Sequence, residues 1–470
     1  MAHRILLLNP PFEPGRGFSR EGRCTQASDF WSTPWPPYSL ASIAAAVRTD
    51  HEVAILDCPA RNMGRAPLRA WVAAYRPDIV IASSSTPTID SDLSVLHDLK
   101  SALGLATAVF GIHASVFSKE IVTGSDVDFV IRNEPEETAR ELLAAIGGRG
   151  DVSKVPGLAF RDANGQAVLT EARPFIKDLD ALPFPAWDLV DLDRYRLPLY
   201  GRKFLIVGTI RGCPFNCSFC NSHVYYGARA RVRSVSSLIA EIRYGRHDFG
   251  VEDFFFWGDT FTLVREQVRS LCQRIIDDTP GIRWVANSRV DTVDAEILGL
   301  MRRAGCWMVS YGIESGDEAV LRRCGKGITP EKVLRAVRLA QRAGLKVAGH
   351  FILGLPGETE ASARRTLDFA KRLHLDFSNF YAAVPFPGSA LYDEALNRGW
   401  LRPSEWARFH QSDFVMDLPT IAAARLRRLR RQAYRSSAFR PKNVSLVADA
   451  LRRRVLQVFH KAPGHPRKGG

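Results

Sequence analysis

Three cysteines in one short stretch carry the most specific chemistry in this sequence. Cys213, Cys217 and Cys220 follow the spacing C-x3-C-x2-C, directly after the apolar run 204–207. Thiolates are soft ligands that suit iron–sulfur clusters, and three of them can each bind one iron of a [4Fe–4S] cube, which leaves the fourth iron without a protein ligand. A metal position that the protein leaves open is one where a substrate can bind. The spacing therefore predicts a catalytic iron–sulfur cluster.

Other interpretations of these cysteines have less support. A zinc site would need a fourth Cys or His in the loop, and His223 is the only near candidate. Three thiols within eight residues are also not typical of core packing. The other five cysteines form no second cluster motif, so we expect one cluster; they are Cys24, Cys58, Cys272, Cys306 and Cys324.

The cysteines follow the first of six apolar runs that alternate with helical patterns. The predicted strands are 204–209, 253–257, 283–288, 307–313, 346–353 and 377–383, and the predicted helices are 236–244, 264–277, 294–304, 330–343 and 359–373. Six such units are too few to close an eightfold barrel. We therefore expect a partial (β/α)6 barrel over residues 199–400, with its site at the carboxyl ends of the strands.

Distinctive residues end several of these strands. They are, in chain order, Asp259, Ser288 with Arg289, Glu314, and Leu353 with Gly354. A carboxylate at Asp259 could hold an ammonium group, Arg289 could hold a carboxylate, and Glu314 could accept hydrogen bonds from two ribose hydroxyls. Each has an ordinary alternative, because an Asp after a strand is often a helix cap and an isolated Glu is often solvated.

The first 150 residues also alternate between strands and helices. The predicted strands are 4–9, 52–57, 78–83, 107–112 and 128–133, and the predicted helices are 38–47, 67–75, 90–103, 115–122 and 135–146, with Asp90 as an N-cap and Pro135 in a first helical position. This order predicts an α/β, doubly wound, Rossmann-like domain. Such sheets bind ligands beyond the carboxyl ends of their strands, here the loops 10–17, 83–88 and 111–115.

Two segments lie outside these repeats. Residues 151–198 read as a linker, with a hairpin around Asn164-Gly165 followed by a stretch that is rich in proline and acids. Residues 401–470 read as a basic helical extension, in which 422–435 and 446–458 have the pattern of amphipathic helices. Such helices can lie on anionic lipid, and the alternative is a solvated cap over the barrel.

Composition limits the class of protein. The chain has 470 residues, of which 46% are hydrophobic, and it contains no run of apolar residues long enough for a transmembrane helix. The beginning of the chain lacks a signal-peptide pattern, so we expect a cytoplasmic protein, at most peripheral to the membrane. The net charge of +14 is local: residues 421–470 carry 14 Lys and Arg against one acid, or +13, which leaves +1 for the rest. A nucleic-acid partner is therefore not expected.

With its cysteine loop and polar strand ends, the sequence resembles the radical S-adenosylmethionine (SAM) superfamily. The resemblance implies that Cys213, Cys217 and Cys220 hold a [4Fe–4S] cluster whose open iron binds SAM. It also implies that Asp259 faces the methionine amine and Glu314 the ribose. The strand end at Leu353 and Gly354 would contact the adenine, with Ser288 and Arg289 also lining the SAM site.

The N-terminal part narrows this resemblance to the subfamily in which a cobalamin-binding domain precedes the radical core. The similarity spans residues 4–400 and extends to anaerobic magnesium-protoporphyrin cyclases and hopanoid-modifying radical enzymes. It implies cobalamin contacts at Pro10, Ser84, Thr86, Gly111 and His113. The motif D-x-H-x-x-G is absent, so we expect no histidine ligand on the lower face of cobalt, and a buried or hydrogen-bonded role for His113.

These features favour a cobalamin-dependent radical SAM methyltransferase that acts at an unactivated carbon of a small-molecule or lipid-like substrate. Such an enzyme would need an external electron donor, such as flavodoxin or ferredoxin. An oxidative cyclase or ring-rearranging enzyme, acting on a tetrapyrrole or a lipid-linked substrate with the same cofactors, is the first alternative. A non-enzymatic iron–sulfur redox sensor is a more remote one.

Overall fold

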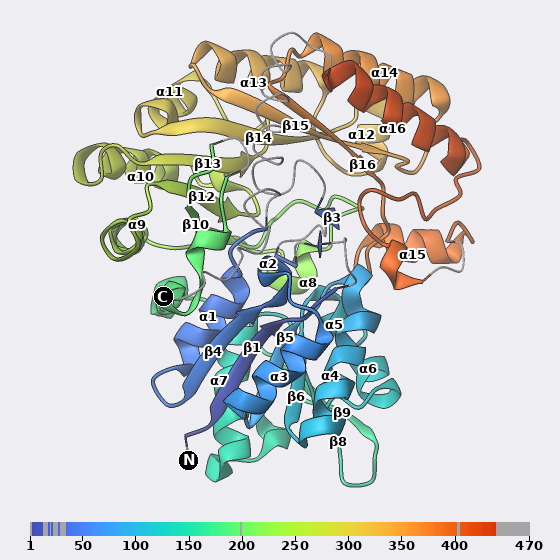
Figure 1. Cartoon of the computed structure of the whole chain (residues 1–470). Coiled ribbons are helices and arrows are strands. Elements are labelled where there is room, and N and C mark those ends of the chain that lie inside the picture. Colours follow the sequence, from blue (N-terminus) through green and yellow to red (C-terminus); the bar gives the residue numbers. More distant parts are fainter. Residues whose placement is uncertain are drawn as a thin grey trace, which may run out of the picture.

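The structure is a computed structural model with two seven-stranded sheets, one in each half of the chain (Figure 1). It describes residues 2–12, 17–18, 20–21, 27–28, 34–197, 200–401 and 405–438. The two sheets lie one above the other in Figure 1, with the N-terminal sheet below and the C-terminal sheet above. The predicted combination of a doubly wound domain and a partial barrel is confirmed.

The first sheet has the strand order β4-β1-β5-β6-β7-β8-β9. Its parallel strands are β1 (Arg4–Asn9), β4 (Glu52–Asp57), β5 (Ile79–Ser83), β6 (Ala106–Phe110) and β7 (Phe129–Ile131). Alternate side chains of β1 enter two different cores: Ile5 and Leu7 one, Leu6 and Leu8 the other. Both faces of the sheet are therefore covered, as the continuous apolar runs predict.

Helices cover the two faces of this sheet. They are α1 (Tyr38–Val47), α2 (Cys58–Arg61), α3 (Arg65–Tyr75), α4 (Ile89–Leu103), α5 (Ile112–Val116), α6 (Ser118–Gly124) and α7 (Pro135–Ala144). Buried residues of α1 and α7 belong to the core of Ile5, and those of α3, α4 and α6 to the core of Leu6. Pro135 occupies the first turn of α7, as predicted.

Three local predictions in this domain were wrong. The strand expected at 107–112 ends at Phe110, because Gly111 adopts φ 132° and α5 begins at Ile112. The single helix expected at 115–122 is two short helices, α5 and α6. Asp90 is not an N-cap, since a 3-10 turn at Thr86–Thr88 runs straight into α4 and makes Thr88 the capping position.

The predicted hairpin around Asn164-Gly165 is present, and it extends the first sheet. Its strands are β8 (Leu158–Arg161) and β9 (Ala167–Leu169), and β8 pairs antiparallel with β7. Short 3-10 turns at Val152–Lys154, Leu179–Ala181, Trp187–Leu189 and Leu192–Arg194 flank or follow it. The first sheet thus continues beyond residue 150. A separate two-stranded sheet pairs β2 (Gly17–Phe18) with β3 (Ala27–Ser28).

The second sheet contains the six predicted parallel strands, with a short antiparallel strand at one edge. Its order is β11-β10-β12-β13-β14-β15-β16. The strands are β10 (Phe204–Arg211), β11 (Arg231–Val232), β12 (Asp253–Gly258), β13 (Arg283–Ser288), β14 (Cys306–Glu314), β15 (Lys346–Leu353) and β16 (Phe377–Ala382). The strands β10 and β16 are not paired with each other, so the barrel is open.

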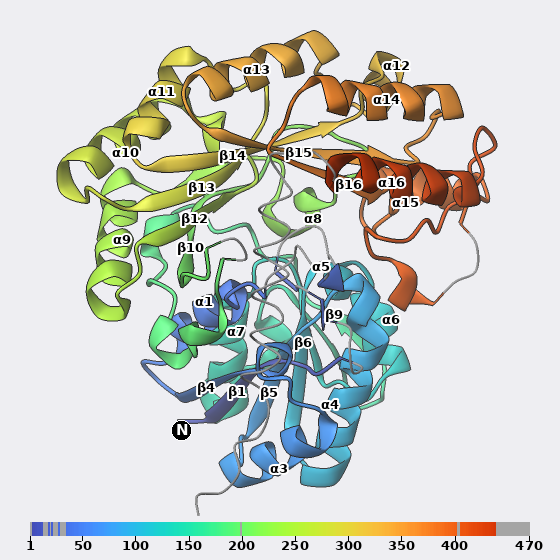
Figure 2. The same ribbon diagram turned by 45° about the horizontal axis from the view of Figure 1, so that its top comes forward.

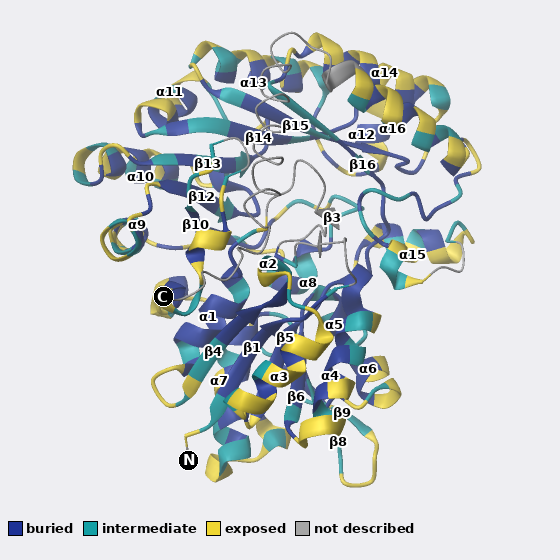
Figure 3. Ribbon diagram, in the orientation of Figure 1, coloured by how far each residue is buried: buried dark blue, intermediate teal, exposed yellow. Residues whose placement is uncertain are grey.

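The helices of the second half lie on the outside of the curved sheet (Figure 2). They are α8 (Ser222–Tyr226), α9 (Val235–Phe249), α10 (Arg265–Asp278), α11 (Ala295–Arg303), α12 (Glu318–Arg323), α13 (Pro330–Arg342), α14 (Glu360–Arg372), α15 (Ala390–Asn397) and α16 (Ala423–Ala438), with 3-10 turns at Phe261–Leu263 and Trp406–Arg408. The exceptions are α8 and α15, which lie towards the first domain (Figure 2). Side-chain caps at Asp294 and Thr359 begin α11 and α14. Figure 3 shows the buried strands of both sheets beneath helices with exposed outer faces.

The first of the two predicted basic helices is α16, and its apolar side packs on the barrel. Leu426 and Leu429 are buried against β16 and α14, and the Tyr434 hydroxyl accepts a hydrogen bond from the Phe380 backbone N–H at 3.1 Å. This face is therefore covered by protein. The second predicted helix, 446–458, lies outside the described residues. In the part of the chain that the structure describes, no helix is both long and apolar enough to span a membrane.

Candidate active site between the two sheets

The cysteine loop leaves the carboxyl end of β10 through a sharp turn at Gly212. Gly212 has φ 86°, and a Cβ there would lie 2.3 Å from the Arg229 carbonyl oxygen, so only glycine fits. Its N–H donates to Asp259 Oδ2 at 2.8 Å, which joins the loop to the end of β12. Cys213 is buried, whereas Cys217 and Cys220 are partly exposed. The loop thus presents two thiols at the mouth of the barrel from a fixed backbone.

Two cations stand over the aromatic residues of this loop. The Arg289 guanidinium lies 3.6 Å from the ring centre of Phe215, and the Lys326 ammonium lies 5.9 Å from that of Phe219. Burial raises the pKa of the Cys217 thiol, and the nearby Lys326 ammonium counteracts that shift. Positive charge beside the loop stabilises thiolates, which are the form that binds metal.

The donor set fits a cluster better than a single ion. His223, the candidate fourth zinc ligand, uses Nε2 in a 2.6 Å hydrogen bond with the Cys213 carbonyl oxygen. Among the described residues, no three His, Cys, Asp or Glu side chains converge to hold one metal ion. In a cube each thiolate binds a different iron, so its ligands stand apart from one another. Three thiols on one loop, one buried and two partly exposed, supply that donor set.

Two of the residues predicted at the strand ends, Ser288 and Arg289, follow one another where β13 ends. Ser288 bonds to Thr262 through their hydroxyls, and it is buried at the end of β13. Arg289 is held by two hydrogen bonds to Asp291, at 2.9 and 2.8 Å, and by one of 2.8 Å to the Lys326 carbonyl oxygen. A guanidinium fixed in this way is pre-organised for an anion.

Glu314 forms a buried ion pair that the sequence alone did not suggest. It ends β14 with φ 64°, and its Oε1 accepts from Lys326 Nζ at 2.6 Å, with both side chains 8% exposed. A Cβ on Gly312 would lie 2.5 Å from Glu314 Oε1, so the carboxylate folds back over that glycine. The only sequence signal for Lys326 is the pair of glycines on either side of it, both with positive φ.

The end of β15 offers backbone rather than side chains. The Leu353 side chain is fully buried in the core, and Gly354 turns the chain with φ 89°. The Gly354 N–H donates to the carboxyl of Glu358, a group whose pKa burial raises to about 8. At neutral pH the Glu358 carboxyl is therefore mostly protonated, and it holds this turn by accepting the Gly354 hydrogen bond.

The predicted edge of the first sheet lines a cavity that opens in part to solvent. Ser84, Thr86, Gly111 and His113 all contribute to its wall. Gly111 is required by geometry as well as by φ, because a Cβ there would lie 2.3 Å from the Ser84 carbonyl oxygen. Pro10 is buried directly after β1 and is not among the lining residues.

His113 has the buried role that the sequence predicts. It is 3% exposed, its ring packs against Phe117 and Trp406, and burial lowers its pKa to about 3. The imidazole is therefore neutral at any physiological pH. Within the described residues its Nδ1 has no hydrogen-bond partner.

The barrel supplies the opposite wall of the same cavity. This wall consists of Asn221, Tyr225, Tyr226, Trp257 and Phe386. Asn221 directly follows Cys220, so the wall continues the cysteine loop. Glu21 also lines the cavity; it accepts hydrogen bonds from Ser39, and burial raises its pKa to about 7. The cavity thus lies between the carboxyl edges of the two sheets.

Comparisons with known proteins agree with this architecture. Residues 207–370 match the model of the radical SAM superfamily. The chain is 34% identical to an uncharacterized methyltransferase of Pyrococcus horikoshii, over 98% of this chain and 99% of that protein. It is 28% identical to the anaerobic magnesium-protoporphyrin IX monomethyl ester cyclase of Rubrivivax gelatinosus, over 83% of this chain and 70% of that protein.

Solved structures resemble the fold at low sequence identity. The radical SAM methyltransferase TsrM from Kitasatospora setae superposes with a TM-score of 0.69 and 20% identity, over 86% of this chain and 76% of that one. The cobalamin-dependent SAM radical enzyme OxsB gives 0.66 and 19%, over 87% and 57%. The chain is therefore a radical SAM enzyme. Its two-sheet fold is shared with TsrM and OxsB.

Proposed function

We propose that the protein is a cobalamin-dependent radical SAM methyltransferase that acts on an unactivated carbon of a small molecule. One cavity carries this proposal. It is lined on one side by residues that follow the cysteine loop, such as Asn221 and Tyr225, and on the other by the carboxyl edge of the first sheet. When bound, the cluster supplies the electron that cleaves SAM to a 5′-deoxyadenosyl radical, and methylcobalamin supplies the methyl group. Both groups must reach one substrate, which a shared cavity allows.

In this proposal the barrel residues bind and orient SAM. Cys213, Cys217 and Cys220 ligate three irons, and Asp259 lies beside the loop to receive the methionine amine. Arg289 faces the methionine carboxylate, with Asp291 and the Lys326 carbonyl keeping its guanidinium in place. Glu314 accepts hydrogen bonds from the ribose while Lys326 balances its charge. Ser288 and the backbone at Leu353 and Gly354 complete the SAM pocket.

The residues at the first sheet suit a large planar group with little net charge. Ser84, Thr86 and Gly111 present small side chains and accessible backbone, as expected where a macrocycle stacks on the edge of a sheet. The neutral His113 adds an aromatic ring without charge. Tyr225, Tyr226, Trp257 and Phe386 exclude water from the opposite side, which protects a carbon radical from side reactions.

Anaerobic reconstitution tests this proposal directly. The protein would be loaded with iron, sulfide and hydroxocobalamin, then incubated with SAM and a chemical reductant. We expect bound cobalamin in the visible spectrum, together with release of 5′-deoxyadenosine and S-adenosylhomocysteine. Protein that binds no cobalamin, or that releases 5′-deoxyadenosine without S-adenosylhomocysteine, would contradict methyl transfer.

An oxidative cyclase is the second candidate, and the similarity to the cyclase of Rubrivivax gelatinosus favours it. The cofactors and the residues that hold them would be the same. Such an enzyme would form 5′-deoxyadenosine in step with substrate oxidation and would consume no methyl group. The ratio of the two SAM-derived products therefore separates the two functions.

We also propose an external one-electron donor of the flavodoxin or ferredoxin type, because each SAM cleavage consumes an electron that the chain's own residues do not supply. A peripheral membrane contact, if made, would use residues 439–470, because the apolar face of α16 is already packed on the barrel. Binding of anionic liposomes by the full chain, compared with a chain that ends at residue 438, tests that contact. Equal binding would exclude it.

A further inference from the structure

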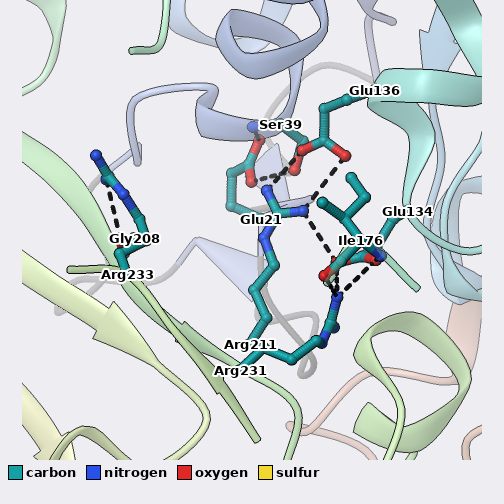
Figure 4. A network of polar contacts seen from close by, with 9 residues as sticks. All are labelled: Glu21, Ser39, Glu134, Glu136, Ile176, Gly208, Arg211, Arg231 and Arg233. Atoms are coloured by element: carbon teal, nitrogen blue, oxygen red, sulfur yellow. Dashed lines mark hydrogen bonds and ion pairs between the residues drawn. The ribbon is translucent and has the colours of Figure 1, made fainter. Parts of the chain in front are cut away.

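A network of buried charges joins the barrel to the first domain (Figure 4). Arg211 is the last residue of β10, and its guanidinium is 8% exposed. Its Nη2 donates to Glu136 Oε1 at 2.6 Å, and its Nη1 donates to Glu134 Oε1 at 3.0 Å. One arginine of the barrel thus holds two carboxylates of the other domain.

A second arginine extends the same network. Arg231, in β11, donates to Glu134 Oε2 at 2.9 Å and to the Tyr226 carbonyl oxygen at 2.6 Å. The Glu134 carboxylate also accepts from the Ile176 backbone N–H at 2.8 Å. Two arginines and two glutamates balance in charge, and the side chains are at most 9% exposed. Each buried charge therefore has its partners.

The elements that this network joins are the two that form the cavity. Glu134 and Glu136 stand at the start of α7, which follows β7 at the carboxyl edge of the first sheet, where a helix N-terminus favours negative charge. Arg211 comes two residues before Cys213, and its guanidinium lies 5.2 Å from the ring centre of Tyr226, a cavity residue. The network therefore spans from the cysteine loop to the first sheet.

We propose that Arg211 and Glu136, supported by Glu134 and Arg231, are positioning residues that fix the cysteine loop relative to the carboxyl edge of the first sheet. The proposal rests on the proposed function, in which a group at each side acts on one substrate. A bidentate arginine–carboxylate arrangement sets direction as well as distance, and burial prevents water from replacing either partner. If the cysteine loop shifted relative to the first sheet, the radical would form away from the group with which it must react, and the reaction would slow.

Another ion pair between the first domain and the segment that leads to the barrel lacks these properties. Arg48 in α1 meets Asp188 at 2.7 Å, but the two side chains are 42% and 41% exposed. Exposed pairs of this kind contribute little and leave their partners free to move. Of these two contacts, the buried Arg211 network is the better suited to hold the cysteine loop at a fixed distance from the first sheet.

The distance itself can be measured in the loaded protein. With the cluster reduced and cobalamin as cob(II)alamin, both centres are paramagnetic, and their dipolar coupling in the electron paramagnetic resonance spectrum reports their separation. We would compare wild type with Glu136→Gln and with the milder Arg211→Lys. The matched control is Asp253→Asn, which removes an equally buried carboxylate paired with Arg202 and Arg283 at the start of β12, the end of the strand opposite the cysteine loop.

We expect wild type to show one resolved coupling, and Glu136→Gln to lose that resolution while keeping its iron and cobalamin content. Asp253→Asn should keep the wild-type coupling. If Glu136→Gln does not fold, Arg211→Lys gives the answer, since it keeps the charge and loses the second hydrogen-bonding branch.

Other outcomes overturn the inference. A coupling that is unchanged in both interface variants, or changed equally in the control, would mean that the network does not set the distance. Absence of any cob(II)alamin signal in wild type would overturn the proposed function as well. The two failures are therefore distinguishable.

Discussion

The carboxyl edges of the two sheets differ in the chemistry of the residues that they carry. The barrel edge carries charged groups held in pairs, such as Glu314 with Lys326 and Arg289 with Asp291. The edge of the first sheet carries mainly small neutral groups, such as Ser84, Thr86 and Gly111, with Arg20 and Glu21 beside them in the cavity wall.

This difference shows what each edge is built to bind. Paired charges that are already oriented suit a small zwitterion with separate amine, carboxylate and ribose groups. Small side chains and exposed backbone suit close approach by a broad planar surface. The same βα topology thus supports two kinds of site, because the residues at the strand ends, and not the strands, determine the ligand.

The largest effect should come from the cysteine loop. Cys217→Ala should remove one of three iron ligands, so the protein should lose its cluster and all formation of 5′-deoxyadenosine. Cys272→Ala is the matched control, since this thiol is buried in α10 away from the loop and should not alter the iron content. Iron and sulfide analysis with product chromatography checks both. A Cys217→Ala protein that still cleaves SAM would show that this thiol is not a required cluster ligand.

Loss of one charge at the barrel edge should weaken SAM binding without removing the cluster. Glu314→Gln leaves Lys326 without its buried anionic partner and removes a charged acceptor for the ribose, so we expect the Kd for SAM to rise about tenfold. Equilibrium dialysis with cluster-loaded protein measures this. Glu318→Gln, an exposed change in the next helix, should leave the Kd unchanged. Equal affinities of wild type and Glu314→Gln would show that this pair is only structural.

At the edge of the first sheet, added bulk should impair ligand binding, whereas at the barrel edge the loss of a charge should impair it. Gly111→Ala places a Cβ against the Ser84 carbonyl at an unfavourable φ, which should cost about 1–3 kcal/mol of stability and reduce the retention of cobalamin during gel filtration. Gly104→Ala is the control, because it also has positive φ but meets no atom within 4 Å. Similar cobalamin retention by the two variants would show that the edge tolerates added bulk.

The smallest effect concerns pH and the turn at the end of β15. Burial raises the pKa of Glu358 from 4.5 to about 8, so the folded protein binds this proton more tightly than the unfolded chain does. That stabilisation is fully present below the unfolded pKa of 4.5 and is lost as pH rises through about 8.

Glu358→Gln should remove this dependence. Between pH 5 and pH 8, wild type should lose at least about 1 kcal/mol more stability than the variant, measured by urea unfolding. Glu360→Gln is the control: arginine partners lower the pKa of Glu360 to about 2, so its effect should be constant over this range. Parallel pH profiles of wild type and Glu358→Gln would show that the acid does not titrate there.

Much of the fold follows from local sequence patterns. The predicted bounds of β1, β4, β13 and β15 agree with the structure, because each is a short apolar or alternating run that lies between helical patterns. The errors fall at element ends. Gly111 ended a strand early because its φ lies outside the extended region, and Thr88 displaced Asp90 as a cap because a 3-10 turn already led into the helix.

The sequence by itself determined the cysteine motif and the residues at the strand ends, because spacing along one loop and the position of a residue after a strand are local properties. Only the tertiary structure decided the partners of those residues. Glu136 is 75 positions from Arg211, and Lys326 reaches Glu314 only because an entire helix folds back over the cysteine loop. The first pair depends on how the two sheets pack together and the second on how the chain turns back after α12, and no local pattern contains that information.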